Sequence, residues 1–97
     1  MRKVIVIGID GATWDLIKPW VKENKLHTFK KLMEESVWGE LESTIPPMTG
    51  PAWVSFATGK NPGKHGCYDF LLPQNTLNEM KTITSKDIKG DTFYEML

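Results

Sequence analysis

This chain of 97 residues contains little cysteine and histidine, and it has no net charge. The single cysteine, Cys67, has no partner for an internal disulfide, so the fold is not built on disulfide bridges. The only histidines are His27 and His65, and neither has a second Cys or His at zinc-finger spacing. Twelve Lys and Arg balance twelve Asp and Glu, which gives no electrostatic basis for binding a nucleic-acid polymer or a membrane surface.

Long hydrophobic runs are also absent. The most apolar stretch, "VIVIGI" at residues 4–9, runs directly into Asp10 and is too short for the core of a signal peptide or for a membrane span. The sequence shows no internal repeat and no low-complexity tract. We therefore expect a cytoplasmic protein in which residues 1–97 form one unit.

Two segments have the composition of β-strands. The run "KVIVIGIDG", residues 3–11, is rich in β-branched residues without polar alternation, which predicts a central strand of a parallel sheet with both faces covered. "VWGELEST", residues 37–44, alternates and predicts a second strand nearer the sheet edge. A third strand is expected around residues 80–84.

Two helices are expected between the first two strands. Apolar residues recur at helical spacing over residues 13–26, where Pro19 limits the segment to a short helix or two broken turns. Residues 27–36 predict a second helix with Thr28 as its cap and an end near Ser36.

The second half of the chain continues the alternation of helices and strands. "GPAWVSFATG", residues 50–59, predicts a helix of about eight to nine residues that stops at Gly59. "KNPGKHG", residues 60–66, has the composition of a loop. A last helix is expected from Asp91 onward. The order of elements predicts an α/β fold.

Asp10 stands at the carboxyl end of the predicted first strand, between two glycines. In open parallel sheets this end of a strand lines the ligand crevice, which makes Asp10 a candidate metal ligand. The alternative is that its carboxylate caps the following helix or stabilises an Asp-Gly turn.

Thr49 is a hydroxyl placed just before a predicted helix. Unpaired N–H groups and the helix dipole favour an alkoxide or a phosphate at such a position, provided that a base or a metal ion activates the alcohol. The alternative is an N-cap threonine. Ser43 and Thr44 are rival hydroxyls that fall in a predicted strand, and Ser55 falls in the middle of a helix.

His65 lies in the predicted loop, where it could contact an anion or a metal ion. Loop histidines are more often solvated or hydrogen-bonded, and this one has no partner in the sequence. Lys60 and Lys64 could attract phosphate, but a solvated loop explains them equally well. His27 is interpreted as structural.

Two windows taken together carry a family resemblance. "VIVIGIDGATWDLI" followed by "STIPPMTGPAWVSFATGKNPGKHG" resembles the type I phosphodiesterase / nucleotide pyrophosphatase family of the alkaline phosphatase superfamily. The resemblance implies that Asp10 binds a metal ion and that Thr49 is the nucleophile and also a metal ligand. The framework that follows the nucleophile is matched by Ser55, Thr58, Gly59, His65 and Gly66.

The same resemblance implies a fold and a chemistry. The fold would be alkaline-phosphatase-like, three-layer α/β/α with a mostly parallel sheet, of which this chain would be an incomplete, N-terminal portion. The activity would be hydrolysis of a small phosphoester or nucleotide with two divalent ions, expected to be zinc, with manganese as the alternative. Further Asp and His ligands would lie downstream, so we expect the chain alone to have little turnover. Gly50 stands where many relatives have a bulkier residue, and Ala52 stands where the nucleotide pyrophosphatases proper have an asparagine that helps to hold the phosphate, so the resemblance identifies no substrate.

Two other classes of function remain open. "GIDGAT" resembles the phosphate loop of sugar kinases and actin-like ATPases, but in those proteins a β-hairpin should follow, whereas "WDLIKPW" predicts a helix. The other class is a non-catalytic remnant that self-associates through an apolar C-terminal face formed by Phe93, Tyr94, Met96 and Leu97.

Overall fold

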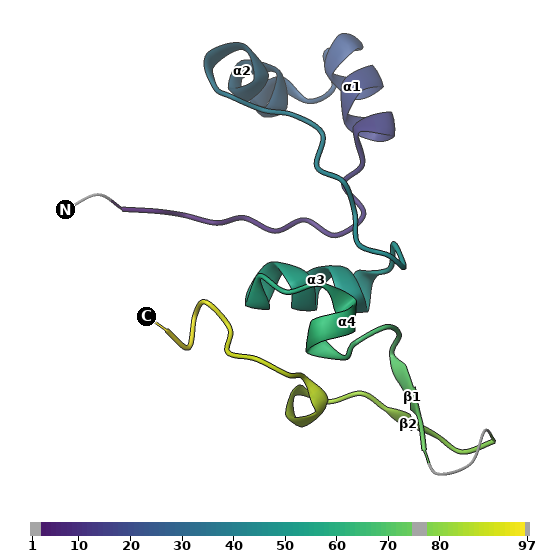
Figure 1. Cartoon of the computed structure of the whole chain (residues 1–97). Helices are drawn as coiled ribbons and strands as arrows, with labels where there is room; N and C mark the ends of the chain where they lie inside the picture. The colour runs from purple at the N-terminus through teal and green to yellow at the C-terminus, as the bar shows by residue number, and fades with distance from the viewer. Residues whose placement is uncertain (1–2, 75–77, 97) are drawn as a thin grey trace. The chain divides into compact units, whose positions relative to one another are not determined.

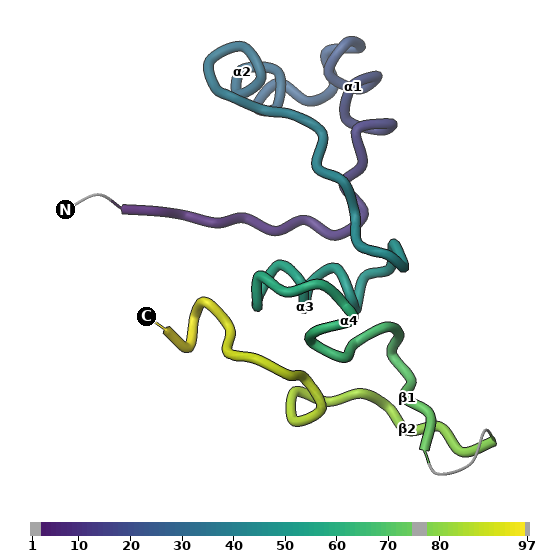
Figure 2. The backbone as a smooth tube through the Cα atoms, in the orientation of Figure 1, coloured from purple at the N-terminus to yellow at the C-terminus, as the bar shows by residue number. Residues whose placement is uncertain are grey.

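The computed structural model describes residues 3–74 and 78–96 of the chain. The backbone divides into two units, Met1–Leu41 and Glu42–Leu97, and each is described by itself (Figures 1 and 2). None of the helices in the described residues is long and apolar enough to cross a membrane.

The first unit contains helices α1, Trp14–Lys22, and α2, His27–Glu35. Thr13 caps α1, because its side-chain oxygen accepts a hydrogen bond from the backbone N–H of Asp15 at 3.3 Å. Pro19 lies inside α1, which runs for nine residues, so the prediction of a short helix is confirmed.

The predicted cap of α2 is wrong. The helix begins at His27, with Leu26 at the N-cap position and no side-chain cap, so Thr28 lies inside the first turn. A capping side chain must precede the first helical residue to reach the free N–H groups. The predicted end is confirmed, since Ser36 is the C-cap and its N–H donates to the carbonyl of Leu32.

The two segments predicted as parallel strands are extended but have no strand partner in the described part of the chain. Residues 3–9 form a stretched segment before α1, and residues 37–44 follow α2 without a ladder (Figure 1). Val4 and Ile7 are 85% and 79% exposed. A strand requires a neighbour to accept its backbone hydrogen bonds, so the mostly parallel sheet is not among the described elements.

The second unit begins with α3, Thr49–Thr58, and the one-turn helix α4, Pro62–His65. A loop was predicted where α4 lies, and this prediction is wrong. The Asn61 side chain accepts a hydrogen bond from the N–H of Lys64 at 3.0 Å, and Pro62 occupies the first helical position. Asparagine at the cap and proline at the first position start a helical turn as readily as they start a loop.

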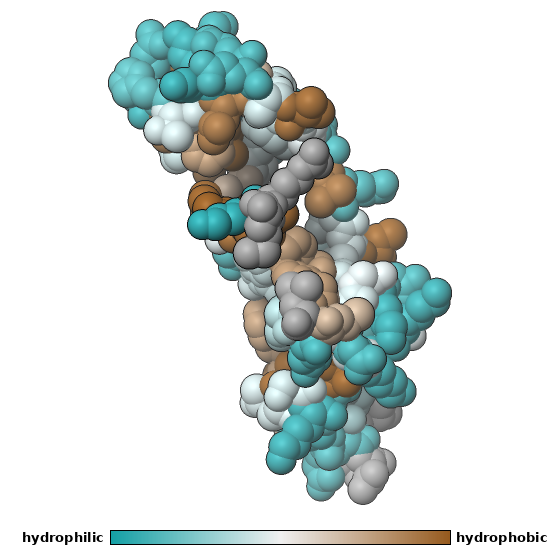
Figure 3. All heavy atoms as spheres, turned by 90° about the vertical axis from the view of Figure 1, so that its left-hand side faces the viewer, coloured by the Kyte–Doolittle hydropathy of each residue, from teal (hydrophilic) through white to brown (hydrophobic). Residues whose placement is uncertain are grey.

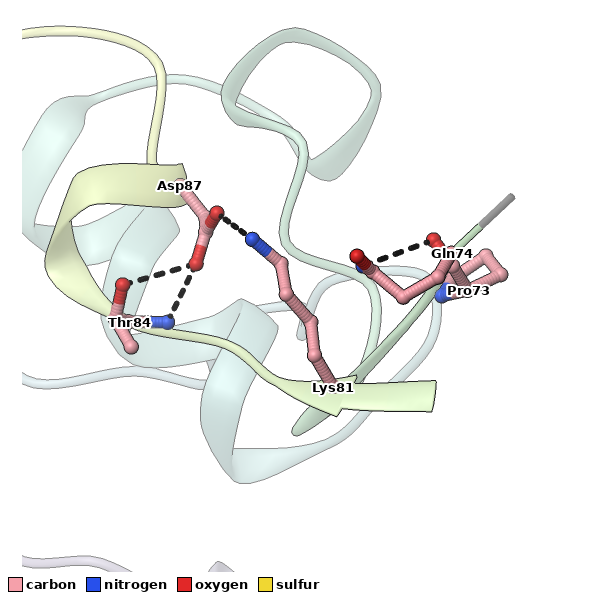
Figure 4. A network of polar contacts seen from close by, with 5 residues as sticks. All are labelled: Pro73, Gln74, Lys81, Thr84 and Asp87. Atoms are coloured by element: carbon pink, nitrogen blue, oxygen red, sulfur yellow. Dashed lines mark hydrogen bonds and ion pairs between the residues drawn. The ribbon is translucent and has the colours of Figure 1, made fainter. Parts of the chain in front are cut away.

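A short antiparallel hairpin follows, formed by β1, Leu71–Pro73, and β2, Met80–Thr82. Its register pairs Leu72 with Lys81, and it confirms a strand within the predicted region 80–84. The next turn, Ser85–Asp87, is a 3₁₀ helix. Figure 4 shows Lys81 and Thr84 both reaching the carboxylate of Asp87, which joins the strand to this turn.

The helix predicted from Asp91 is wrong for the residues described. Thr92 and Glu95 make the hydrogen bonds of a helix start, because the N–H of Thr92 donates to Glu95 Oε2 at 2.8 Å. Only one turn forms, through residues 93–95, and the N–H of Phe93 donates to the carbonyl of Ala57 in α3 instead. Leu97 lies outside the described residues.

Few side chains are buried in either unit. The first unit buries Ile17, and the second buries Pro51, Pro62, His65 and Cys67. Large apolar side chains remain at the surface, as the brown areas of Figure 3 show. The ordered centre of the second unit is therefore the junction of α3 and α4.

Candidate functional site

Thr49 is the first residue of α3, and the N-cap position belongs to Met48, which makes no side-chain cap. The first helical hydrogen bond runs from the N–H of Ala52 to the carbonyl of Met48 at 3.0 Å. Thr49 is therefore not an N-cap, and the capping alternative is wrong for this residue. Its exposed side chain needs another explanation.

The first turn of α3 also presents backbone donors. Among the hydrogen bonds of the described residues, none uses the N–H of Thr49 or of Gly50. Pro51, the third residue of the helix, carries no N–H. Two N–H groups and one hydroxyl thus lie together at the positive end of a ten-residue helix, an arrangement that suits a phosphate group.

Two of the three rival hydroxyls, those of Thr44 and Ser55, are used within the fold. Thr44 Oγ1 donates to the carbonyl of Pro46 at 2.8 Å, and Ser55 Oγ lies 2.9 Å from Nε2 of His65. Ser43 is exposed but does not begin a helix. Of the candidate hydroxyls, Thr49 alone combines exposure with the amino end of a helix.

His65 proves to be an internal residue rather than an anion or metal contact. The side chain is completely buried at the end of α4. Its Nδ1 accepts a hydrogen bond from the N–H of Cys67 at 3.1 Å, while Nε2 meets Ser55. Burial lowers the pKa of the His65 ring, and a hydrogen bond to the carbonyl of Pro51 opposes this effect. The ring joins α3 to the chain that follows it.

The remaining framework residues end the two helices. Gly59 and Gly66 have φ of 64° and 81°, the left-handed conformation that glycine adopts without strain, and each follows the last residue of its helix. Thr58 Oγ1 donates to the carbonyl of Val54 at 2.7 Å. The residues of the "SxxTG…PxxHG" pattern therefore end α3 and α4 and link the two helices, and Thr49 is not among them.

Gly50, which follows Thr49, faces the side chains of Phe70 and Cys67. A Cβ atom at Gly50 would lie 3.5 Å from the Phe70 ring and 3.8 Å from the Cys67 sulfur. Both distances are ordinary van der Waals contacts, so a Cβ atom fits at this position. Burial raises the pKa of the Cys67 thiol, as does the Asp69 carboxylate, so the thiol is a poor nucleophile.

Asp10 belongs to the first unit, where it is exposed in the turn that precedes α1. Because Thr13 caps α1, the alternative that Asp10 caps this helix is wrong. The chain enters α1 at Trp14 and not a β-hairpin, which argues against the phosphate loop of the kinase class. Asp10 and Thr49 lie in separately described units.

A hollow of the second unit lies away from Thr49. An open cavity of about 730 Å³ is lined in part by Ser43, Thr44, Ser55, Lys60 and Asn61, and Thr49 is not among its lining residues. Its Thr44 and Ser55 hydroxyls are engaged in internal hydrogen bonds. We therefore place the candidate site at Thr49 and not in this cavity.

The metal ligands implied by the resemblance do not form a set here. Within residues 3–74 and 78–96, no group of three or more His, Cys, Asp or Glu side chains is arranged to hold a metal ion. Asp10 and Thr49 could each supply one oxygen, which is fewer than the four ligands of a tetrahedral zinc site. The described residues do not fit a complete metal centre.

Sequence reasoning missed the role of the Ser55–His65 pair. It placed His65 in a loop and Ser55 in mid-helix, and their spacing of ten residues matches no single element. The available signal was the Asn61-Pro62 step, which could have indicated that a helical turn precedes His65.

Comparison with protein families gives one match. A family model described as type I phosphodiesterase / nucleotide pyrophosphatase matches residues 4–95, which is nearly the whole chain. No curated protein and no solved structure matches the chain.

Proposed function

Because this chain belongs to the type I phosphodiesterase / nucleotide pyrophosphatase family, we propose that it carries the nucleophile of a metal-dependent phosphoester hydrolase. The observation that carries the proposal is the exposed hydroxyl of Thr49 at the first residue of α3, beside two N–H groups that no described hydrogen bond uses. The substrate class is a small phosphodiester or pyrophosphate.

Thr49 acts in the proposed reaction as the attacking alcohol. Its Oγ1 forms a bond to phosphorus while the bond from phosphorus to the leaving ester oxygen breaks, and the threonine proton is released as the leaving oxygen gains one. Water then attacks the phosphothreonine, releases phosphate monoester and restores the hydroxyl. The N–H groups of Thr49 and Gly50 hold a phosphate oxygen at the helix terminus during both steps.

Asp10 is the proposed metal ligand of the first unit. Two divalent cations, zinc in preference to manganese, would supply Lewis-acid stabilisation of the phosphate oxygens when bound. Since the described residues do not complete a metal centre, ligands beyond Asp10 and Thr49 are required. For this reason we expect low turnover from the 97-residue chain alone.

The proposed fold is the three-layer α/β/α arrangement with a mostly parallel sheet. Support comes from two extended segments, the apolar residues 3–9 and the alternating residues 37–44, which are unpaired in the described residues and joined through α1 and α2. Parallel strands require a crossover of a dozen or more residues that usually includes a helix, and this connection is long enough. In such a sheet Asp10 would stand at the carboxyl end of a strand, where ligands bind.

The test uses orthovanadate, which mimics a phosphoryl group in transfer, added to ¹⁵N-labelled chain in the presence of zinc. We expect the amide resonances of Thr49 and Gly50 to shift most, and the shifts to weaken in Thr49→Ala. Thr28→Ala is the matched control, because Thr28 is also an exposed threonine in the first turn of a helix. Shifts that are spread over the lysines, or that are unchanged in Thr49→Ala, contradict the proposal.

A second measurement addresses turnover. The chain is incubated with bis(p-nitrophenyl) phosphate and zinc or manganese, and nitrophenol is followed by absorbance. Metal-dependent release that disappears in Thr49→Ala and persists in Thr28→Ala would support the nucleophile and overturn the expectation of low turnover. Equal release from both variants would remove Thr49 from the reaction.

A further inference from the structure

The hydrogen bonds of His65 identify its tautomer. Nδ1 accepts from the backbone N–H of Cys67 at 3.1 Å, so its lone pair is occupied and it carries no proton. In the neutral ring the proton is then on Nε2, which lies 2.9 Å from Ser55 Oγ and donates to it. The carbonyl of Pro51 is a further acceptor for the ring. Both acceptors belong to α3.

The backbone around the ring closes a loop of contacts. The carbonyl of His65 accepts from the N–H of Lys89 at 2.9 Å, which ties the end of α4 to the segment after the hairpin. Pro51 is buried and lies two residues after Thr49, and its carbonyl is a hydrogen-bond partner of the ring. The His65 ring thus contacts α3 at Pro51 and Ser55, while its backbone carbonyl holds the segment that contains Lys89.

We propose that His65 is a positioning residue for the Thr49 site: as a neutral ring protonated at Nε2 it holds the first turn of α3 in place, and its protonation at Nδ1 releases that turn. The link between His65 and catalysis rests on the proposed function, whereas the effect of His65 protonation on α3 does not depend on it. A proton on Nδ1 would face the N–H of Cys67, replacing an acceptor by a second donor in a dry site.

Nearby charged groups do not account for the lowered pKa of His65. α3 contains no charged residue. The titratable residues nearest to His65 along the chain are Lys64, Cys67, Tyr68 and Asp69, and Asp87 and Lys89 come from the segment that contacts the end of α4. None of them is a cause of its lowered pKa, which comes first from burial. Release should therefore follow the protonation of His65 itself.

The experiment is an NMR titration of the whole chain labelled with ¹⁵N, from pH 7.5 downward. Long-range ¹H–¹⁵N spectra report the ring tautomer, and amide spectra report Thr49 and Gly50. We expect the Nε2–H tautomer at the start, and amide shifts at Thr49 and Gly50 with the same midpoint as the His65 ring. The ring of His27, exposed at the start of α2, provides reference resonances in the same spectra.

Two variants separate positioning from packing. In Ser55→Ala the ring loses its acceptor on α3, so the tautomer preference should weaken and α3 should lose amide-exchange protection already at neutral pH. In His65→Gln the side-chain amide can still donate to Ser55 but cannot titrate, so protection of α3 should be independent of pH. In the wild type it should fall by up to about tenfold per pH unit across the titration.

Several results would overturn the proposal. These are an Nδ1–H tautomer at neutral pH, a His65 ring that titrates while the Thr49 and Gly50 amides stay still, or an α3 whose protection is insensitive to pH in the wild type. If the vanadate test fails but the shared midpoint is found, the proposed function falls and the switch in α3 stands. If vanadate binds at Thr49 but no shared midpoint is found, the proposed role of His65 is wrong and the proposed role of Thr49 stands.

Discussion

The indole rings of Trp14 and Trp38 pack with their centroids 4.8 Å apart and their planes tilted by 43°. Trp14 lies at the start of α1, and Trp38 follows α2 in the segment predicted as a strand. Each indole N–H is used: Trp14 donates to the carbonyl of Gly39 at 3.1 Å and Trp38 to that of Met33 at 3.0 Å. The pair therefore fixes where the chain leaves α2.

Replacing Trp38 by alanine should lower the free energy of unfolding by about 1–3 kcal/mol, the combined size of an aromatic pair and one hydrogen bond. Urea denaturation followed by circular dichroism measures it. Trp38→Phe keeps a ring against Trp14 and should recover part of the loss. Trp20→Ala is the control, since Trp20 is similarly exposed and has no aromatic partner in the described residues. Equal losses at Trp20 and Trp38 would contradict the role of the pair.

Thr49→Ala should leave stability almost unchanged, within about 0.5 kcal/mol, because the side chain is exposed and does not cap α3. Asn61→Ala is the comparison, since Asn61 does cap a helix, and it should cost about 1 kcal/mol. Urea denaturation of the two variants side by side measures the difference. A loss in Thr49→Ala as large as that in Asn61→Ala would mean that Thr49 stabilises the helix start after all.

Asp87 should make the second unit sensitive to strong acid. Its hydrogen bond with Lys81, followed by those from the Thr84 backbone and side chain, lowers the pKa of Asp87 from 3.8 to about 2 (Figure 4). A carboxyl with a lowered pKa stabilises the folded chain above its unfolded pKa, and this stabilisation is lost as the pH falls through the folded value. The free energy of unfolding should thus decrease between about pH 4 and pH 2.

The variant that tests this is Asp87→Asn, which should flatten that part of the profile because the side chain no longer titrates. Asp91→Asn is the control, since no described hydrogen bond uses the Asp91 side chain, and it should follow the wild type. Chemical denaturation at a series of pH values measures all three proteins. A slope that survives in Asp87→Asn would assign the acid sensitivity to another carboxyl.

Helices were predictable from the sequence because their hydrogen bonds are local. α1, α2 and α3 lie where apolar spacing placed them, and Gly59 ends α3 as expected. The errors at helix starts, Thr28 and Asn61, arose where a single residue type serves both a cap and a loop. One shift of position changed the interpretation of Thr49 from a possible cap to a free hydroxyl.

The parallel sheet could not be settled from residues 3–9 and 37–44 because strand pairing depends on distant partners. Composition indicates that residues 3–9 suit a buried strand and residues 37–44 a strand nearer the sheet edge, but a buried strand needs neighbours on two edges and two faces. The same applies to the site: the motifs located Asp10 and Thr49, whereas the hydrogen bond between Ser55 and His65 depends on how α3 and α4 pack. Local sequence patterns predict the helices, whereas the contacts between elements depend on tertiary packing.

The extended segment at residues 4–9 should make the chain associate at high concentration. Ile5 and Ile7 are 84% and 79% exposed, more than Tyr94 at 62% in the C-terminal segment, and no described backbone hydrogen bond pairs residues 4–9 with another strand. An exposed apolar strand with free edges is a template for pairing between copies. We therefore expect sedimentation velocity to show mass increasing with concentration, and the Ile5→Lys/Ile7→Lys variant to stay monomeric at concentrations where the wild type associates. The matched variant Tyr94→Lys/Met96→Lys should associate as the wild type does. If the C-terminal variant alone abolishes association, the apolar C-terminal face is the contact and the strand segment is not.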